Sequence, residues 1–283
     1  MKTGASPKTL NIIGCGKVGK TLARLWAQRS TLIVQDILNR TPDSARKAAA
    51  FIGAGHAVDD YAGLRAADVC LIAATDDQIA ACCEQLAHAG QLGPSTIVFH
   101  CSGALPSSVL QAAVQCGASV ASIHPIRSFA DPAQAAAAFD GTYCGAEGDT
   151  QALEALNDAF SAIGARIVPI HSDGKILYHS AAVFACNYLV TLLDVALQAY
   201  QQSGVPQEVA LRLMEPLVRG TIDNVFKAGT VNALTGPIAR GDLATTAKQA
   251  HAVADWCADY GKLYEQFVAL TKELAARRND ADT

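Results

Sequence analysis

Three glycines near the start of the chain have the spacing of a dinucleotide-binding turn. Gly14, Gly16 and Gly19 follow an apolar segment that ends at Ile13, and helical periodicity continues after them from Thr21. In the pattern G-x-G-x-x-G the first glycine permits a tight turn, the second lets the backbone approach a pyrophosphate, and the third lets helix and strand pack closely. The helix N-terminus then offers N–H groups and a partial positive charge to the phosphates, whereas a merely structural turn would leave them unused. The residues expected to contact a dinucleotide here are Gly14, Cys15, Gly16, Lys17, Val18 and Gly19.

The residues after the second predicted strand, at 31–38, bear on which dinucleotide binds. An NAD site usually places an acid there for the ribose 2′-hydroxyl, whereas an NADP site places a cation there for the 2′-phosphate. Arg40 offers a planar fork of donors, with Asn39 and Thr41 as neutral neighbours, and Asp36 is discounted because it lies inside the strand. We therefore expect NADP as the cofactor. The alternative is that Arg40 is a solvated loop residue and Thr41 only caps the next helix.

Polar groups also follow three segments that read as buried strands, at residues 67–74, 96–100 and 118–123. Near-continuous apolar strands are typical of a parallel sheet that is covered on both faces. Ligands of such sheets bind beyond the carboxyl ends of the strands, so these groups are expected to line a site. We expect substrate contacts from His100 and Ser102. The further cofactor contacts expected at these strand ends are Ala74, Thr75, Asp76, Ile79, Cys101 and Ser102.

A long helix predicted from residue 175 to 203 is apolar nearly all round, which predicts that it is buried. Its polar exceptions Ser180, Asn187 and Asp194 recur every seven residues and share roughly one face, with His179 beside them. Buried polar groups need partners, either in the protein or in a ligand. The stripe is therefore expected to face either the cofactor cleft, with Ser180 contacting the substrate, or another helix or a second copy of the chain. For Asp194 we favour the second interpretation.

The loop at residues 234–242 is the other polar anomaly. Two glycines and a proline give it an unusual path. Arg240 is expected to bind a substrate carboxylate through two parallel hydrogen bonds. The alternative is that Arg240 pairs with an acid and that Asp242 simply caps the helix that follows.

These residues need a scaffold of alternating strands and helices, followed by helices alone. Residues 141–146 and 165–170 also read as strands and residues 150–163 as an amphipathic helix. The sequence predicts an α/β fold, with a Rossmann domain and a mostly parallel sheet at residues 1–172 and an all-α domain at residues 173–283. Beyond the long helix, further helices are expected from Pro206 to about Arg219 and, in one or two pieces, from Asp242 to Arg278.

Composition argues against several other classes of protein. With 51% hydrophobic and 17% charged residues, the chain of 283 residues can bury a large core, and its net charge of −4 argues against nucleic-acid binding. None of the nine cysteines lies in a C-x-x-C pair, so we expect reduced thiols and no metal site. The N-terminus does not resemble a signal peptide, and the segment 181–197 is too short and too polar for a membrane span. We expect a soluble, cytoplasmic protein.

The combination of these motifs resembles a known family of Rossmann-like NADP oxidoreductases, of the deazaflavin-dependent type, that carry a C-terminal helical domain of unknown function. More distantly, the layout is similar to pyrroline-carboxylate reductases, prephenate dehydrogenases and β-hydroxyacid dehydrogenases. The resemblance implies an NADP-binding domain, a helical second domain and a homodimer formed mainly through the helical domain. The stretches that carry it are residues 14–19, 39–41, 100–105, 124–125, 178–182, Asn187 and residues 235–242.

One departure from the distant relatives concerns the catalytic acid or base. The β-hydroxyacid dehydrogenases place a lysine four residues before a helix asparagine, whereas the residue four before Asn187 is Val183. The acid or base must then come from elsewhere. His124 and His179 are the candidates, because imidazole titrates near neutrality. Asn187 is expected to position the reacting group.

The sequence thus favours an NADP(H)-dependent oxidoreductase that acts on a small polar substrate bound between the two domains. The cofactor would do the hydride chemistry, and the protein would supply orientation and proton transfer. The missing lysine motivates an alternative, a non-catalytic NADP-binding redox sensor or regulatory protein. A third hypothesis is hydride exchange between NADP and a deazaflavin.

Overall fold

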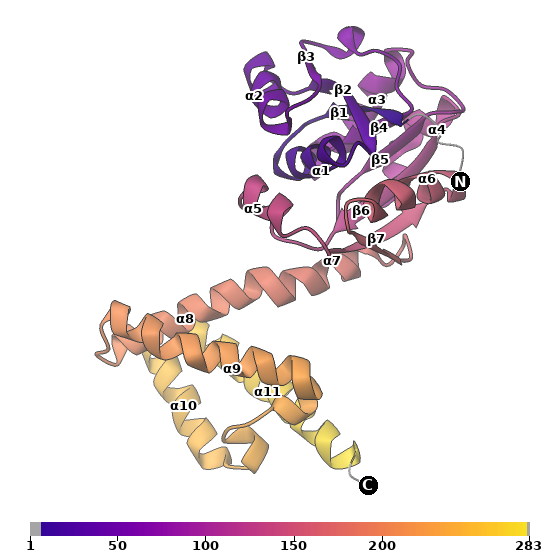
Figure 1. Cartoon of the computed structure of the whole chain (residues 1–283). Coiled ribbons are helices and arrows are strands. Elements are labelled where there is room, and N and C mark those ends of the chain that lie inside the picture. Colours follow the sequence, from indigo (N-terminus) through magenta and orange to yellow (C-terminus); the bar gives the residue numbers. More distant parts are fainter. Residues whose placement is uncertain (1–6, 282–283) are drawn as a thin grey trace. The chain divides into compact units, whose positions relative to one another are not determined.

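The computed structural model describes residues 7–281 of the chain. Contacts divide the chain into two compact units, one that ends at Ala185 and one that begins at Cys186 (Figure 1). The first unit is α/β and the second is helical, which confirms the predicted fold class. The contact boundary lies inside the long helix, and the domain boundary expected after residue 172 stays a prediction.

The first unit is built on an eight-stranded sheet with the strand order β3-β2-β1-β4-β5-β6-β7-β8 (Figure 1). Neighbouring strands are parallel except for β6 and β7, which are antiparallel. The strand order runs outward in both directions from β1 and β4, so the carboxyl ends of these two strands form the switch point where ligands of such sheets bind. The strands are β1 (Lys8–Ile13), β2 (Leu32–Leu38), β3 (His56–Val58), β4 (Val69–Ile72), β5 (Ile97–His100), β6 (Ser119–Pro125), β7 (Tyr143–Gly148) and β8 (Arg166–Pro169).

Helices cover both faces of this sheet. Successive side chains of a strand point to opposite faces, and in the central strands both sets are apolar and need to be covered. Val69 and Leu71 of β4 pack into a core with α1, α2 and α6, whereas Cys70 and Ile72 pack into a second core with α3 and α4. The central strands are therefore apolar on both sides, as the sequence predicts. The helices of this unit are α1 (Lys17–Gln28), α2 (Pro42–Ile52), α3 (Asp76–His88), α4 (Gln111–Gln115), α5 (Pro132–Ala137), α6 (Thr150–Ser161) and α7 (Lys175–Val183), with 3₁₀ turns at Tyr61–Gly63 and Ser107–Leu110.

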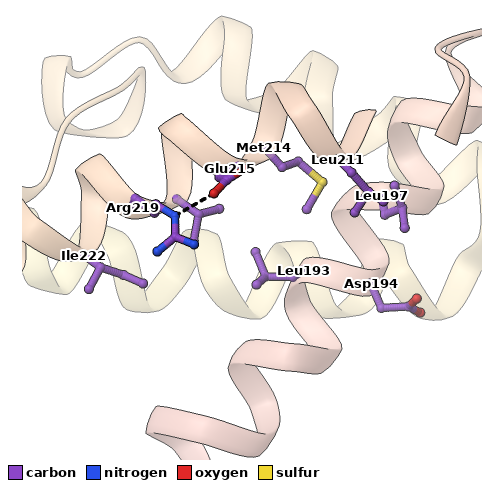
Figure 2. Close-up of a pocket in the computed structure, with 9 residues that line it drawn as sticks. Leu193, Asp194, Leu197, Leu211, Met214, Glu215, Arg219 and Ile222 are labelled. Carbon is purple, nitrogen blue, oxygen red and sulfur yellow. Dashed lines mark hydrogen bonds and ion pairs between the residues drawn. The ribbon is translucent and has the colours of Figure 1, made fainter. Parts of the chain in front are cut away.

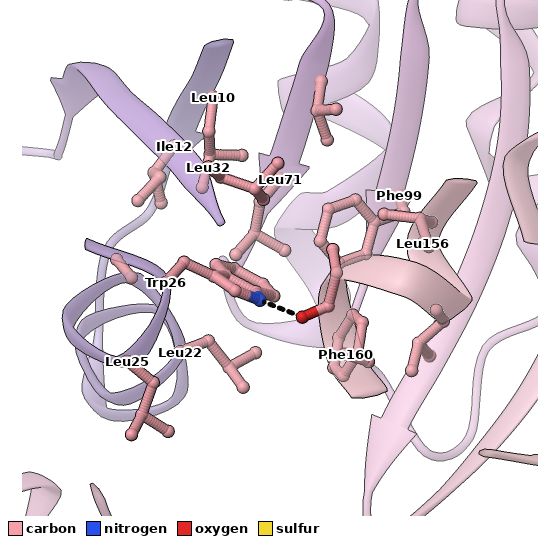
Figure 3. Packing of buried hydrophobic residues seen from close by; sticks show 14 of the residues in the cluster. Leu10, Ile12, Leu22, Leu25, Trp26, Leu32, Leu71, Phe99, Leu156 and Phe160 are labelled. Carbon is pink, nitrogen blue, oxygen red and sulfur yellow. Dashed lines mark hydrogen bonds between the residues drawn. The ribbon is translucent and has the colours of Figure 1, made fainter. Parts of the chain in front are cut away.

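Trp26 of α1 joins the two ends of the first core (Figure 3). Its ring is fully buried and packs edge-on against Phe99 of β5 and Phe160 of α6, with ring centroids 6.3 Å and 5.3 Å away. The indole Nε1–H donates to the carbonyl oxygen of Ala159 over 3.0 Å, so the polar end of the ring is satisfied. This contact fixes the helix that follows the glycine turn against the far half of the sheet.

The long helix continues from α7 through a π-helical turn at Phe184–Tyr188 into α8 (Leu189–Gln202). The next helix, α9 (Gln207–Ala233), extends beyond its predicted end near Arg219 and is bent at Gly229, where φ is 78°. The region after the 3₁₀ turn Ile238–Arg240 forms two helices, α10 (Leu243–Trp256) and α11 (Ala258–Ala281).

The expectation that the long helix is buried is wrong for the single chain. Leu177 is 78% exposed and Val190 is 67% exposed. By length and composition alone, residues 175–202 are also the one helix of the described chain that could cross a membrane, with a mean hydropathy of 1.7 in its most apolar window. An apolar face indicates that something covers the helix, but the pattern does not identify what covers it.

Candidate functional site

Each glycine of the turn after β1 meets the requirement that its spacing predicts. Gly14 has a φ of 75°, and a Cβ on it would lie 2.7 Å from the backbone nitrogen of Ala74. A Cβ on Gly19 would lie 3.1 Å from the Cβ of Ala73, so this glycine permits the close packing of α1 on β4. A Cβ on Gly16 would meet only the oxygen of Gly14, at 3.8 Å, and would otherwise occupy open space. That open space is where a bound pyrophosphate is expected to approach the backbone.

The N-terminus of α1 fits an anionic ligand. Gly16 is its N-cap and makes no side-chain hydrogen bond, so no side chain caps the first turn. The side-chain oxygen Oδ1 of Asn39 accepts the backbone N–H of Cys15 over 2.6 Å and so ties the turn to the end of β2. Lys17 is exposed, whereas Val18 is half-buried. Burial raises the pKa of the Cys15 thiol to about 12, so only the backbone of this residue suits a ligand.

At the end of β2, the acid that could compete for a ribose hydroxyl is bonded within the protein. Asp36 is 1% exposed, and its carboxylate accepts hydrogen bonds from the Arg65 guanidinium at 2.6 Å and from the Arg65 backbone N–H at 2.9 Å. It is therefore not available to a ribose. Arg40 and Thr41 are both exposed, and the hydroxyl of Thr41 accepts the backbone N–H of Ser44 as the cap of α2.

The predicted cofactor contacts after β4 are of three kinds. Ala74 lies against the glycine turn, as the clash with a Cβ on Gly14 indicates. Thr75 and Asp76 are exposed at the start of α3 and face solvent. Ile79 is 1% exposed and belongs to the second core, so its side chain supports the helix instead of a ligand.

His100 and Ser102 hold the loop after β5 together. Nδ1 of His100 accepts the backbone N–H of Ser102 over 3.1 Å, and Nε2 then donates to the Pro106 carbonyl oxygen over 3.2 Å. The ring is fully buried, and burial lowers its pKa to about 4. The hydroxyl of Ser102 accepts the N–H groups of Ala104 and Leu105. The expected substrate role of His100 is therefore not supported, because both ring nitrogens are already bonded within the loop.

Cys101 and Gly103, the neighbours of Ser102 in this loop, contact different parts of the unit. Cys101 is half-buried and packs at the edge of the first core. Gly103 lies beside the imidazoles of both His124 and His179, because a Cβ on it would clash with Nδ1 of His179 and lie 2.9 Å from Nε2 of His124. The two ring centroids are 5.5 Å apart. The structure thus brings together both predicted acid–base candidates, and we call Gly103, His124, Tyr178 and His179 the histidine site.

Tyr178 pairs with one ring nitrogen of His124. The Tyr178 hydroxyl oxygen lies 3.3 Å from Nδ1 of His124, and the two rings pack edge-on with centroids 5.7 Å apart. The donor and acceptor in this hydrogen bond depend on the tautomer of the imidazole. Burial, followed by the neighbouring charges of His179 and Lys175, lowers the pKa of His124 to about 4. His124 is therefore a neutral hydrogen-bond donor at pH 7.

Three members of this region were missed by sequence reasoning: Gly103, Tyr178 and Lys175. Lys175 and Tyr178 lie in the first turns of a helix that reads as apolar, and a lysine that is 1% exposed there is an unusual feature. The available signal is that Tyr178 and His179 follow Lys175 by three and four residues. It places all three side chains on one face of α7.

Of the other predicted site residues, Ser180 follows His179 on α7, whereas Asn187 and Arg240 belong to the second unit. Ser180 bonds to the carbonyl oxygen of Ile176 within its own helix, over 2.8 Å. Asn187 is exposed in the π-helical turn, a kind of irregularity that is frequent at functional sites. Arg240 is exposed, and Asp242 caps α10 by accepting the backbone N–H of Thr245, which agrees with the structural alternative for this loop.

A cavity of about 570 Å³ lies in the second unit (Figure 2). Leucines and other apolar side chains of α8 and α9 line it, together with Asp194 and the ion pair between Glu215 and Arg219, whose Nε–Oε1 distance is 2.9 Å. None of the predicted catalytic residues lines it. In the part of the chain that the structure describes, no group of three or more His, Cys, Asp or Glu side chains could hold a metal ion.

Comparison with known proteins identifies the two parts of the chain. Residues 5–125 match the family model of a Rossmann-like domain, and residues 142–271 match that of a domain of unknown function, DUF2520. These matches confirm the expected combination of a Rossmann-like domain with a helical C-terminal domain of unknown function. No protein of curated function matches the chain.

Three solved structures illustrate the likeness in fold. Protein TM1727 from Thermotoga maritima is 28% identical, with a TM-score of 0.74 over 95% of this chain and 99% of that one. BF3122 from Bacteroides fragilis, described as a candidate NADP oxidoreductase, is 21% identical, with a TM-score of 0.74 and the same coverage. The pyrroline carboxylate reductase of Plasmodium falciparum, solved with NADP bound, is 13% identical, with a TM-score of 0.60 over 96% of this chain and 100% of that one.

Proposed function

We propose that this chain, a Rossmann-like domain followed by a DUF2520 domain, is an NADP(H)-dependent oxidoreductase that reduces or oxidises a small polar substrate. The observation that carries the proposal is the edge-to-face contact of His124 and His179 beside Gly103, in the loop that follows β5. This loop lies at the carboxyl edge of the parallel strands, the same edge as the glycine turn after β1. An acid–base pair and a dinucleotide site on one sheet edge are the two halves of a dehydrogenase site.

The residues that would hold the cofactor are those of the glycine turn and the end of β2. The uncapped N-terminus of α1 would bind the pyrophosphate, with Gly16 giving the close approach, and Arg40 would bind the 2′-phosphate. When bound, NADPH supplies a hydride to an electrophilic carbon. The glycine turn and Arg40 both follow strand ends, and Arg65 already binds the Asp36 carboxylate. This arrangement favours NADP over NAD.

The two histidines would have different roles toward the substrate, one as a hydrogen-bond donor and one in proton transfer. His124 is neutral, and with its proton on Nε2 it would donate a hydrogen bond to the oxygen or nitrogen whose negative charge grows as the hydride arrives. His179 would exchange the proton with that atom. Asn187, in the π-helical turn, is proposed to position the reacting group, and Ser180 and Arg240 stay proposals for substrate contacts.

The proposal also covers the oligomeric state and the location of the protein. The resemblance to NADP oxidoreductases and the exposed apolar side chains of α8 and α9 favour a homodimer formed through the helical unit. Asp194, Asn187 and other polar residues interrupt the long helix, so we propose a soluble, cytoplasmic enzyme rather than one that spans a membrane.

The test is oxidation of NADPH, followed by its absorbance, against a panel of small imines, aldehydes and ketones. We expect turnover with part of the panel, and His124→Ala or His179→Ala should slow it by roughly a hundredfold or more while NADPH still binds. His251→Ala is the matched control, because His251 is 81% exposed and pairs only with Asp255 of its own helix. Tight NADPH binding without oxidation by any compound would contradict an enzyme and favour the redox-sensor hypothesis.

A further inference from the structure

Lys175 is a buried cation that the proposed reaction does not use. It is the first residue of α7 and is 1% exposed. Its Nζ donates to the carbonyl oxygen of Ser102 over 3.0 Å and to the hydroxyl of Ser122 over 2.5 Å, and it lies 3.9 Å from Oε1 of Glu147. The ammonium group thus makes two hydrogen bonds and one ion pair.

These acceptors come from three different parts of the sheet. Ser102 belongs to the loop after β5, Ser122 to β6 and Glu147 to β7. The Ser122 hydroxyl in turn donates to the same Ser102 carbonyl oxygen, over 3.3 Å. The same Oε1 of Glu147 accepts the backbone N–H of Ser107, and Oε2 accepts the Ser107 hydroxyl, both over 2.7 Å. One ammonium group therefore connects the start of α7 to three neighbouring strands.

The connected segments are the ones that carry the histidine site. Ser102 directly precedes Gly103, which lies so close to both imidazoles that a Cβ on it would clash with His179 and lie 2.9 Å from His124. Tyr178 and His179 follow Lys175 by three and four residues and lie on the same helix face. A shift of the first turns of α7 would change the distance between the two imidazoles, and a shift of the Gly103 turn would change the space beside both of them.

We propose that Lys175 is a positioning residue of the histidine site. Its ammonium group holds the Ser102–Gly103 turn and the start of α7 in fixed register with β6 and β7, and so sets where His124 and His179 meet Gly103. The part played by the two histidines in turnover rests on the proposed function, whereas this geometry does not.

Electrostatics supports the proposal. The Lys175 charge contributes to the lowered pKa of His124, after burial and His179. The groups that face His124 are Lys175, Tyr178 and His179, all from α7, together with the backbone of Gly103. A buried ion pair is weak grounds for stability, because apolar side chains of similar volume often replace such a pair without loss. We therefore assign the Lys175–Glu147 pair a role in positioning His124 and in keeping its imidazole neutral.

The experiment follows the imidazoles by NMR in the full chain without cofactor or substrate. The variants are Lys175→Met, which keeps the length of the side chain, and Lys175→Met with Glu147→Gln, which also avoids an unpaired buried carboxylate. Lys47→Met is the matched control, because Lys47 is 74% exposed and pairs with Asp43 on the surface of the same unit. The resonances of His124 are identified by their loss in His124→Ala.

In both Lys175 variants the titration midpoint of His124 should rise from about 4 toward its ordinary value of 6.5. The His179 resonances should shift as well, and Lys47→Met should change neither. A folded variant in which both histidines titrate as in the parent protein would overturn the proposal. Loss of folding in both variants would also overturn it, because Lys175 would then be required for the fold itself. Neither readout depends on NADPH oxidation, so the outcome is independent of whether a substrate is found.

Discussion

His100 and His124 end neighbouring strands, and in both the pKa is lowered to about 4, with burial as the largest cause. Their bonding differs. Both ring nitrogens of His100 bond within its own loop, whereas Nδ1 of His124 bonds to the Tyr178 hydroxyl and its Nε2 lies beside Gly103. Residue type and position at a strand end predicted both as site residues. Only the hydrogen-bond partners separate the residue that builds the loop from the one that can act on a ligand.

The neutral form of His100 has a consequence for stability that can be measured. Its pKa in the folded state is about 4, below its ordinary value of 6.5, so between these values the unfolded chain binds the proton and the folded chain does not. The free energy of unfolding should therefore fall as the pH falls from about 6.5 to about 4, by roughly 3 kcal/mol from this residue. His124 contributes in the same direction.

Urea unfolding at pH 7 and at about pH 4.5 tests this, with Trp26 as the fluorescent reporter after Trp256→Phe removes the second tryptophan. In His100→Gln the amide replaces both hydrogen bonds without titrating. This variant should lose clearly less stability on acidification than its parent. An equal loss in both proteins would mean that His100 does not carry the effect.

At the scale of elements, the long helix shows what an apolar pattern can and cannot predict. Its existence, its start at Lys175 and its length follow from the sequence, because these depend on local periodicity. The π-helical turn at Phe184–Tyr188 and the bend of α9 at Gly229 were not predicted, because one extra residue per turn or one altered φ leaves no periodic signal. Burial was predicted wrongly, since it depends on what packs against the helix.

The exposed side chains of this unit predict its behaviour in solution. Phe226 of α9 is 86% exposed and Val190 of α8 is 67% exposed, and a second copy of the chain would remove such surface from water. The chain should therefore have a mass of twice 29.5 kDa by light scattering. Phe226→Asp or Val190→Asp should produce monomers, because a buried carboxylate without a partner is costly.

Ile33→Asp is the control for this measurement, since Ile33 is 51% exposed but lies on β2 of the other unit. It should leave the mass unchanged. A wild-type chain that is monomeric at micromolar concentration would contradict the homodimer.

At the scale of the whole molecule, the sequence predicts the cofactor half of the site better than the catalytic half. The glycine turn is local, so Gly14, Gly16 and Gly19 could each be given a role from spacing, and their surroundings agree with it. The histidine site joins a loop near residue 103, a strand end at His124 and a helix at residue 178. Contacts at such sequence separations follow from the strand order, which spacing does not encode. Gly103 and Lys175 therefore emerge only from the fold.

The measurement that tests the central claim most directly is calorimetric titration of the chain with NADPH and with NADH, in the parent protein, Arg40→Ala and Gly16→Ala. NADPH should bind at least about tenfold tighter than NADH, a difference of about 1.4 kcal/mol, and Arg40→Ala should remove that preference. Gly16→Ala should weaken both cofactors, because its Cβ would occupy the open space at the start of α1, whereas the control Gly93→Ala, which also places a Cβ in open space, should bind as the parent does. Equal affinity for NADH and NADPH in the parent would contradict the NADP assignment, and binding of neither would contradict the oxidoreductase.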